Sequence, residues 1–264
     1  MILKIKEIVR QIVYYPKLAL EEVNYDDYWS NKRGKNLGFT NKWQKQRGDW
    51  ILSQVEEGSS VLDVGCGDGG VLLYMKEKKN FNALGADISD ICLNFLNSKG
   101  VEVIKFDIND FSAIEQLPEV DHIMILEVLE HMTNPEKFLK MILPKARKSV
   151  FFSFPNSGYI SYRLRLFFGA FPIQWTIHPG EHLRFWTYRD LKWWLNELNF
   201  KNKSTVHIYE GVPILNRAWK GLFGAGFIVK IQKLNFEIPS FILLTLLLAP
   251  FFINLLMKQT PHIF

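Results

Sequence analysis

The residues with the clearest chemical meaning lie in one glycine-rich segment, residues 61–70, with the sequence Val-Leu-Asp-Val-Gly-Cys-Gly-Asp-Gly-Gly. Its apolar start predicts a strand, and its glycines predict a turn whose backbone can approach a ligand closely. Gly65, Gly67 and Gly70 also fit the dinucleotide-binding pattern G-x-G-x-x-G. However, Asp63 comes two residues before the first glycine, where a carboxylate would repel a pyrophosphate and suit a cationic amino group.

Three further acidic residues follow apolar runs downstream of this segment. Asp87, Asp107 and Glu127 each come directly after a run that predicts a strand. The carboxyl ends of parallel strands meet at one edge of a sheet, so we expect these acids to gather beside the glycine-rich turn. Each has an alternative: Asp87 as a surface acid, Glu127 as a solvated helix residue, and Asp110 in place of Asp107.

In these residues the sequence resembles the class I S-adenosylmethionine-dependent methyltransferases, over residues 25–233. The resemblance implies that S-adenosylmethionine is the cofactor, that Asp87 holds its ribose hydroxyls and that Asp107 binds its adenine amino group. It also implies that Ile108 packs on the adenine ring and that Glu127 lies near the methionine part. The predicted cofactor-binding residues are Asp63, Gly65, Cys66, Gly67, Gly69, Asp87, Ile88, Asp107, Ile108 and Glu127.

A narrower resemblance involves residues 153–156 (Ser-Phe-Pro-Asn), 163–165 (Arg-Leu-Arg) and 181–187 (Glu-His-Leu-Arg-Phe-Trp-Thr), which are similar to the MetW-like branch. The apolar C-terminal end departs from that branch, so a role in methionine metabolism is not carried over. The resemblance leaves a second function open, in which the protein binds the cofactor and regulates another enzyme without methyl transfer of its own. An NAD-dependent enzyme fits only the glycine spacing.

Three histidines are the candidate catalytic residues: His131, His178 and His182. An imidazole can act as a general base near neutral pH, or it can hydrogen-bond to hold a surface segment in place. His131 stands in a segment that the family shares across many substrates, which favours a structural role or contact with the cofactor. His178 and His182 have the i, i+4 spacing of a helical zinc motif, but Pro179 and Gly180 oppose that helix. We therefore predict no metal site.

The chemistry implied by the resemblance is in-line methyl transfer, in which the sulfonium of the cofactor already makes the methyl group reactive. The enzyme mainly aligns a nucleophile, a contribution of about 7–11 kcal/mol in well-oriented systems. We expect O-methylation of a small-molecule, glycan or lipid-linked acceptor, with a base needed only where the acceptor loses a proton. The aromatic residues 156–186 are predicted to form a lid, and Trp29, Arg33 and Arg47 to close over the cofactor's carboxylate.

The residues named above must be positioned by the fold. Apolar runs alternate with helical patterns along most of the chain, which predicts a parallel, doubly wound α/β sheet. The expected fold is Rossmann-like, with a mostly parallel, seven-stranded sheet. Its predicted strands are residues 61–64, 82–86, 101–106, 120–126, 149–154, 204–209 and 225–232. Its predicted helices are residues 41–57, 71–79 and 90–98, with further helices starting at 134–135 and at 187, and residues 25–38 are predicted to be a polar loop.

Charge is unevenly distributed along the 264 residues, which carry a net charge of +5. Residues 51–200 have 15 basic and 19 acidic side chains, a net charge of 15 − 19 = −4, so the excess of positive charge lies at the two ends. An acidic core argues against nucleic acid as a partner, whereas basic ends favour a membrane surface. The two cysteines, Cys66 and Cys92, have no metal-ligand spacing.

Three regions follow from these patterns: a basic amphipathic and helical extension that caps the cofactor (1–57), the methyltransferase domain (58–233) and an apolar tail (234–264). Residues 238–257 carry no charge over the length that a bilayer-spanning helix requires, although two prolines interrupt them. We expect a cytoplasmic protein attached to the cytoplasmic membrane face through this tail. The alternative is a tail buried in a dimer, and the sequence predicts no particular oligomeric state.

Overall fold

The computed structural model describes residues 12, 15, 24–174 and 181–233. Contacts divide the chain into two units, Met1–Lys233 and Leu234–Phe264, and the second unit lies wholly outside the described residues. The predicted apolar tail and nearly all of the predicted amphipathic start therefore fall outside them as well. Among the described residues, no helix combines the length and the apolar character needed to cross a bilayer. Nothing described supports the predicted membrane attachment.

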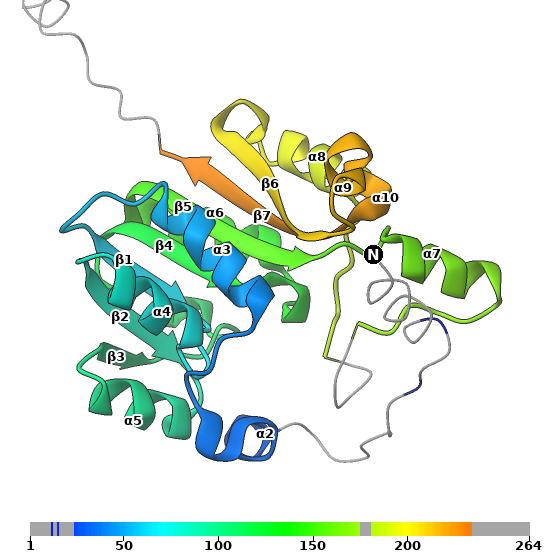
Figure 1. Cartoon of the computed structure of the whole chain (residues 1–264). Coiled ribbons are helices and arrows are strands. Elements are labelled where there is room, and N and C mark those ends of the chain that lie inside the picture. The colour runs from blue at the N-terminus through cyan, green and yellow to red at the C-terminus, as the bar shows by residue number, and fades with distance from the viewer. Residues whose placement is uncertain (1–11, 13–14, 16–23, 175–180, 234–264) are drawn as a thin grey trace, which may run out of the picture. The chain divides into compact units, whose positions relative to one another are not determined.

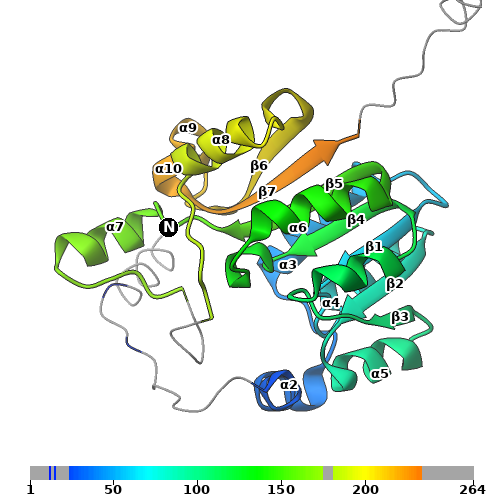
Figure 2. The ribbon, with the colours of Figure 1, turned by 180° about the vertical axis from the view of Figure 1, so that it is seen from behind.

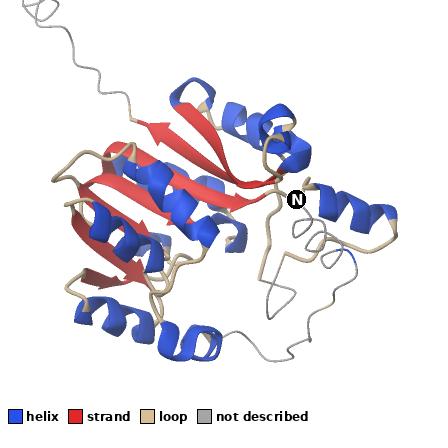
Figure 3. Ribbon diagram, viewed as in Figure 1, coloured by secondary structure: helices blue, strands red, loops and turns tan. Residues whose placement is uncertain are grey.

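One seven-stranded sheet carries the fold, with the strand order β3-β2-β1-β4-β5-β7-β6 (Figures 1 and 3). Strands β1 to β5 run parallel, whereas β7 pairs antiparallel with both β5 and β6. This arrangement confirms the predicted Rossmann-like, mostly parallel sheet. The strands are β1 (Ser60–Val64), β2 (Asn82–Asp87), β3 (Glu102–Lys105), β4 (Val120–Leu126), β5 (Ala146–Pro155), β6 (Ser204–Gly211) and β7 (Gly224–Gln232).

Helices cover both faces of the sheet and bury two apolar layers. Helices α3, α4 and α5 contribute Ile51, Met75 and Leu96 to one layer. Helices α6 and α8 contribute Phe138 and Trp194 to the other layer, on the face seen in Figure 2. Because burial of a large apolar side chain stabilises by about 1.5–3 kcal/mol, these two layers fix the helices against the sheet.

The helices have these bounds: α2 (Tyr25–Arg33), α3 (Lys42–Leu52), α4 (Gly70–Lys78), α5 (Asp90–Ser98), α6 (Pro135–Ile142), α7 (Ile160–Phe167), α8 (Tyr188–Glu197), α9 (Leu215–Ala218) and α10 (Lys220–Phe223). Short 3-10 turns occur at η1 (Gly34–Asn36), η2 (Phe111–Gln116), η3 (Leu129–His131), η4 (Leu143–Lys145) and η5 (Lys201–Lys203). The turn η3 follows β4 and carries part of the site described below.

The prediction of a polar loop at residues 25–38 is wrong, because this segment begins with helix α2 and continues into η1. The Asn24 side chain accepts hydrogen bonds from the backbone N–H groups of Asp26 and Asp27, at 2.9 and 3.2 Å. This cap and the two acids favour a helix start. The Asp26 carboxylate also accepts a hydrogen bond from Ser89 Oγ at 2.5 Å. The contact between Asp26 and Ser89, which are far apart in the sequence, thus holds α2 in place, although α2 has little apolar periodicity of its own.

Several element bounds also differ from the prediction, and one helix was not expected. The helix predicted to reach residue 57 ends at Leu52, where Ser53 forms its C-terminal cap. The predicted lid, residues 156–186, contains helix α7. Aromatic residues obscured the helical pattern there.

The sheet order determines where ligands can bind. Strand β1 pairs with β2 on one side and with β4 on the other, so the chain changes direction across the sheet between them. The carboxyl ends of strands at such a switch point form a crevice in doubly wound folds. The predicted cofactor residues after β1, β2 and β4 therefore meet at one edge.

Candidate active site

A cavity of about 680 Å³ lies at this edge, between the carboxyl ends of β1, β2 and β4. Its other walls come from α2, α3 and the segments around Tyr162, Ile173 and Glu181. Gly69 is not part of the lining, and His178 lies outside the described residues. The other predicted site residues all line it: Asp63, Gly65, Cys66, Gly67, Asp87, Ile88, Asp107, Ile108, Glu127, His131 and His182.

The glycine-rich turn needs its glycines for two reasons. Gly65 and Gly67 have φ angles of +70° and +52°, a region that residues with a Cβ avoid. A Cβ on Gly67 would also lie 2.2 Å from the ring of Trp29, which comes from α2. Gly69 has φ +64° and precedes α4, and a Cβ on it would lie 2.1 Å from Leu96, so the fold itself also requires glycine at this position.

Two buried carboxylates dominate the electrostatics of this end of the cavity. Asp63 is 3% exposed, and its Oδ1 has no hydrogen-bond partner among the described residues. Burial and the nearby charge of Asp87 raise the pKa of Asp63 to about 8, while Arg47 opposes the shift. Asp87 accepts hydrogen bonds from the backbone N–H groups of Gly67 and Ser89, at 2.7 and 2.9 Å. A cation beside Asp63 would satisfy the orphaned oxygen and favour the ionised carboxylate.

The wall beyond Asp87 is mixed in character. Ile88 is 39% exposed and Ile108 packs partly on the core, so both present apolar surface to the cavity. Asp107 Oδ1 accepts a hydrogen bond from the backbone N–H of Asn109 at 2.8 Å. Two apolar side chains beside a carboxylate suit a flat ring that carries a polar amino group.

Glu127, at the end of β4, is held by three neighbours. Its Oε1 lies 2.8 Å from Arg47 Nη1 and accepts hydrogen bonds from Ser153 Oγ at 2.7 Å and Tyr209 Oη at 3.1 Å. Its backbone φ is +56°, in the left-handed region. Arg47 is therefore paired with a protein acid. Sequence reasoning placed Arg47 near the cofactor but missed Tyr209, which lies far along the chain on β6.

The α2 cap adds two aromatic side chains, Tyr25 and Tyr28, that the sequence did not indicate, because the segment was expected to be a loop. Both line the cavity, together with Trp29, which was predicted to lie near the cofactor. Arg33, at the end of the same helix, forms an ion pair with Asp68 of the glycine-rich turn, with Nε to Oδ2 at 3.0 Å. The cap is thus tied to the turn that it covers, and the guanidinium groups of both predicted arginines face protein carboxylates.

His131 and His182 line another part of the same cavity. His131 ends the turn η3, and its ring meets the ring of His182 edge to face, with centroids 4.8 Å apart. Burial and the neighbouring His131 lower the pKa of His182 to about 3. Glu130, for which a solvated helix position was one alternative from the sequence, is buried beside them.

Comparison with known proteins gives the family. The sequence profile of the family described as methionine biosynthesis protein MetW matches residues 46–229. The (S)-tetrahydroprotoberberine N-methyltransferase of Eschscholzia californica is 34% identical over 98 residues, which are 34% of this chain and 27% of that protein. The chain thus spans about a quarter of the length of that relative.

Two further proteins match over more of their length. The ubiquinone biosynthesis O-methyltransferase of Dechloromonas aromatica (strain RCB) is 31% identical over 168 residues, which are 60% of this chain and 72% of that protein. A crystal structure of a SAM-dependent methyltransferase from Archaeoglobus fulgidus has a TM-score of 0.57 at 19% identity, covering 80% of this chain and 100% of that one.

The match to the family profile extends over more than half of the chain, from α3 through most of β7, and includes every strand of the sheet. The predicted family, fold and cofactor, S-adenosylmethionine, are thereby confirmed. This chain belongs to the MetW family of class I S-adenosylmethionine-dependent methyltransferases.

Proposed function

We propose that this protein transfers the methyl group of S-adenosylmethionine to an oxygen atom of a small acceptor that has an apolar part. The observation that carries the proposal is the buried carboxylate of Asp63, whose Oδ1 lacks a hydrogen-bond partner among the described residues. An ammonium group is the cation that such a position suits, and a dinucleotide supplies none there. Asp63 would therefore bind the amino group of the cofactor.

The remaining cofactor contacts are assigned from the resemblance to class I methyltransferases, and they are supported by the presence of these residues in the cavity lining. Asp87 would accept hydrogen bonds from the ribose hydroxyls, and Asp107 from the adenine amino group. Ile88 and Ile108 would pack on the adenine ring, while the backbone of Gly65, Cys66 and Gly67 allows close approach. Glu127 would keep Arg47 in place near the methionine part.

The chain's own residues then orient the reactants. When bound, the cofactor would supply an electrophilic methyl group to the acceptor oxygen. His131 and His182 would contact the acceptor, since both line the cavity and none of the cofactor contacts proposed above involves them. The α2 cap would exclude water, which strengthens the electrostatic contacts.

Exposed aromatic side chains support an acceptor with an apolar part. Tyr162 of α7 lines the cavity, and Phe167, Phe168 and Phe171 at the end of that helix are 80%, 68% and 66% exposed. The likeness to an O-methyltransferase over 72% of that relative's length favours oxygen as the attacking atom. A small-molecule, glycan or lipid-linked hydroxyl would meet both conditions.

A label-transfer experiment tests the proposal. Full-length protein would be incubated with methyl-labelled S-adenosylmethionine and a cell extract, and the products partitioned between organic and aqueous phases. We expect alkali-stable label in a product that partitions toward the organic phase. Asp87→Ala should lose most transfer at limiting cofactor, whereas the matched control Asp110→Asn, an exposed acid outside the cavity lining, should not. Cofactor binding without transfer to any acceptor would favour a regulatory role instead.

A further inference from the structure

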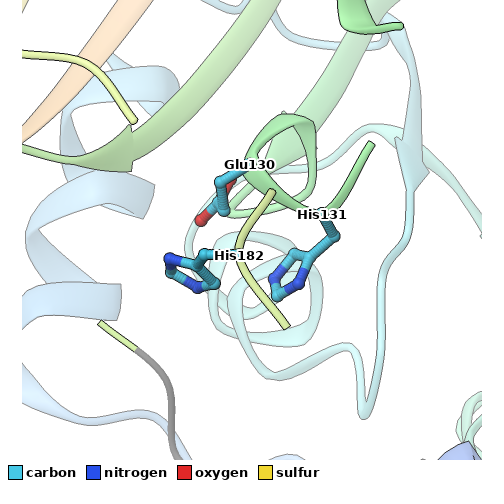
Figure 4. Close-up of side chains that lie close together, drawn as sticks. All are labelled: Glu130, His131 and His182. Atoms are coloured by element: carbon cyan, nitrogen blue, oxygen red, sulfur yellow. The ribbon is translucent and has the colours of Figure 1, made fainter. Parts of the chain in front are cut away.

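A second group of side chains in the cavity is not used by the cofactor contacts proposed above. Glu130 and His131 come from the turn η3, and His182 comes from the segment before α8. One ligand atom from each residue lies within 4.8 Å of the others. Figure 4 shows the three side chains gathered at one point, although His182 is 51 residues from His131 in the sequence.

The carboxylate of Glu130 is the most unusual member. The residue is 1% exposed, and neither carboxylate oxygen has a hydrogen-bond partner among the described residues. Leaving a buried acid without donors is costly, and a bound cation is one of the few ways to compensate for it.

The two imidazoles are oriented as ligands would be. His131 Nδ1 is in hydrogen-bond contact with the backbone oxygen of Glu181. A carbonyl only accepts, so Nδ1 carries the proton and the lone pair of the neutral ring lies on Nε2. Histidines that bind metals have this arrangement, with the second nitrogen bonded to a carbonyl or carboxylate. His182 Nδ1 is buried and has no hydrogen-bond partner among the described residues.

Backbone contacts hold His182 against the turn. The N–H groups of Leu183 and Arg184 both donate to the backbone oxygen of Glu130, at 2.7 and 3.1 Å. The Arg184 guanidinium also forms an ion pair with Glu136 at the start of α6. The segment is therefore held directly after the histidine, and such support keeps ligands in position before an ion arrives.

We propose that Glu130, His131 and His182 bind one divalent transition-metal ion at the acceptor end of the cavity. Two imidazoles and one carboxylate suit zinc and its neighbours in the first transition row better than they suit magnesium or calcium. Three protein ligands leave a position open, where an ion could bind the acceptor oxygen and lower its pKa. That last role rests on the proposed function, whereas binding of the ion does not.

This site departs from the sequence prediction of no metal. From the sequence, only His178 and His182 had the spacing of metal ligands, and Pro179 and Gly180 disfavour the helix that would align them. The structure brings His131 beside His182 instead, through contacts that no local spacing indicates.

Metal titration tests the inference, and it needs neither cofactor nor acceptor. If no metal bound, the proposed methyl transfer would not be contradicted. Full-length protein stripped with a chelator would be titrated with Zn²⁺ against a chromophoric chelator, and with Co²⁺ by visible absorption. We expect one ion per chain and intense cobalt d–d bands. Loss of an outer partner weakens metal sites about 10–100-fold, so Glu130→Gln and His182→Gln should each weaken binding at least 100-fold.

His207→Gln is the matched control, because His207 is exposed on β6 and absent from the cavity lining. It should bind the ion as the wild type does. The circular dichroism and S-adenosylhomocysteine affinity of each variant would show that the fold is intact. Absence of stoichiometric binding in the wild type, or unchanged binding in both Glu130→Gln and His182→Gln, would overturn the site.

Discussion

Two parts of the cavity lining are compared: the cofactor end, around Asp63 and Asp87, and the histidine end, formed by Glu130, His131 and His182. Each buries a carboxyl group that lacks a full set of hydrogen-bond partners among the described residues, yet they suit different ligands. Asp63 is 3% exposed and faces another acid, Asp87, so its end attracts a compact organic cation. Glu130 is 1% exposed and lies beside two imidazoles, so its end offers a set of ligand atoms to a metal ion. Burial alone therefore does not define a site; the neighbouring groups decide what it binds.

The two ends also differ in how the chain builds them. The cofactor end comes from the turns after β1 and β2, whose positions the parallel sheet fixes. The histidine end joins the turn after β4 to a segment about 50 residues later, and backbone hydrogen bonds to Glu130 hold the two together. The first end is set by topology, whereas the second depends on a contact between distant segments.

Asp63→Asn should give the largest difference between the two ends. Removing the charge that faces the cofactor's amino group should weaken S-adenosylhomocysteine binding by about 3 kcal/mol, roughly a hundredfold. Glu130→Gln, a similar change at the other end, should alter that affinity only a few-fold. Isothermal titration calorimetry of both variants measures the contrast, and equal losses would mean that the two ends do not have separate ligands.

The residues of the cofactor end were largely predictable from the sequence, because strand ends in a parallel sheet must meet. Asp63, Asp87 and Glu127 follow apolar runs, and all three line the cavity. Helix α2 was not predictable from apolar periodicity, since its position depends on the bond between Asp26 and Ser89.

The histidine end was not predictable as a group. Glu130 and His131 stand in a recognisable segment, but a carboxylate next to an imidazole in sequence does not reveal burial. The pairing with His182 requires the backbone bonds of Leu183 and Arg184 to Glu130. The only spacing in the sequence that suggested paired metal ligands was that of His178 and His182, and it indicated His178, not His131, as the partner of His182.

Glycine substitutions test whether topology sets the cofactor end. Gly67→Ala adds a Cβ at φ +52° and 2.2 Å from the Trp29 ring, so we expect a loss of about 3 kcal/mol in the free energy of unfolding. Gly100→Ala is the matched control, with φ +71° and open space around its Cβ, and should cost about 1 kcal/mol. Urea denaturation gives both values. Equal losses in the free energy of unfolding would show that only backbone strain contributes and that the contact between Trp29 of α2 and the turn does not.

The smallest effect is a pH dependence confined to the cofactor end. The pKa of Asp63 is raised to about 8, chiefly by burial and by Asp87, with Arg47 opposing. The unfolded chain loses this proton first, so the group stabilises the free fold most below pH ~4 and progressively less as pH rises toward ~8. A cationic ligand reverses the preference, so binding near pH 6.5 should release a proton. As pH rises toward the raised pKa of Asp63, the affinity for S-adenosylhomocysteine should increase by up to about tenfold per pH unit.

Calorimetry in two buffers of different ionisation enthalpy measures the proton released on binding of S-adenosylhomocysteine. The wild type should release a proton and Asp63→Asn should release little, because an amide does not titrate. Burial also raises the pKa of Asp87, so a smaller release that persists in Asp63→Asn would be assigned to that acid. If the wild type released no proton near pH 6.5, Asp63 would already be ionised in the free protein. Asp63 would then be an ordinary ionised carboxylate, and the proposed contrast between the two ends would lose its basis.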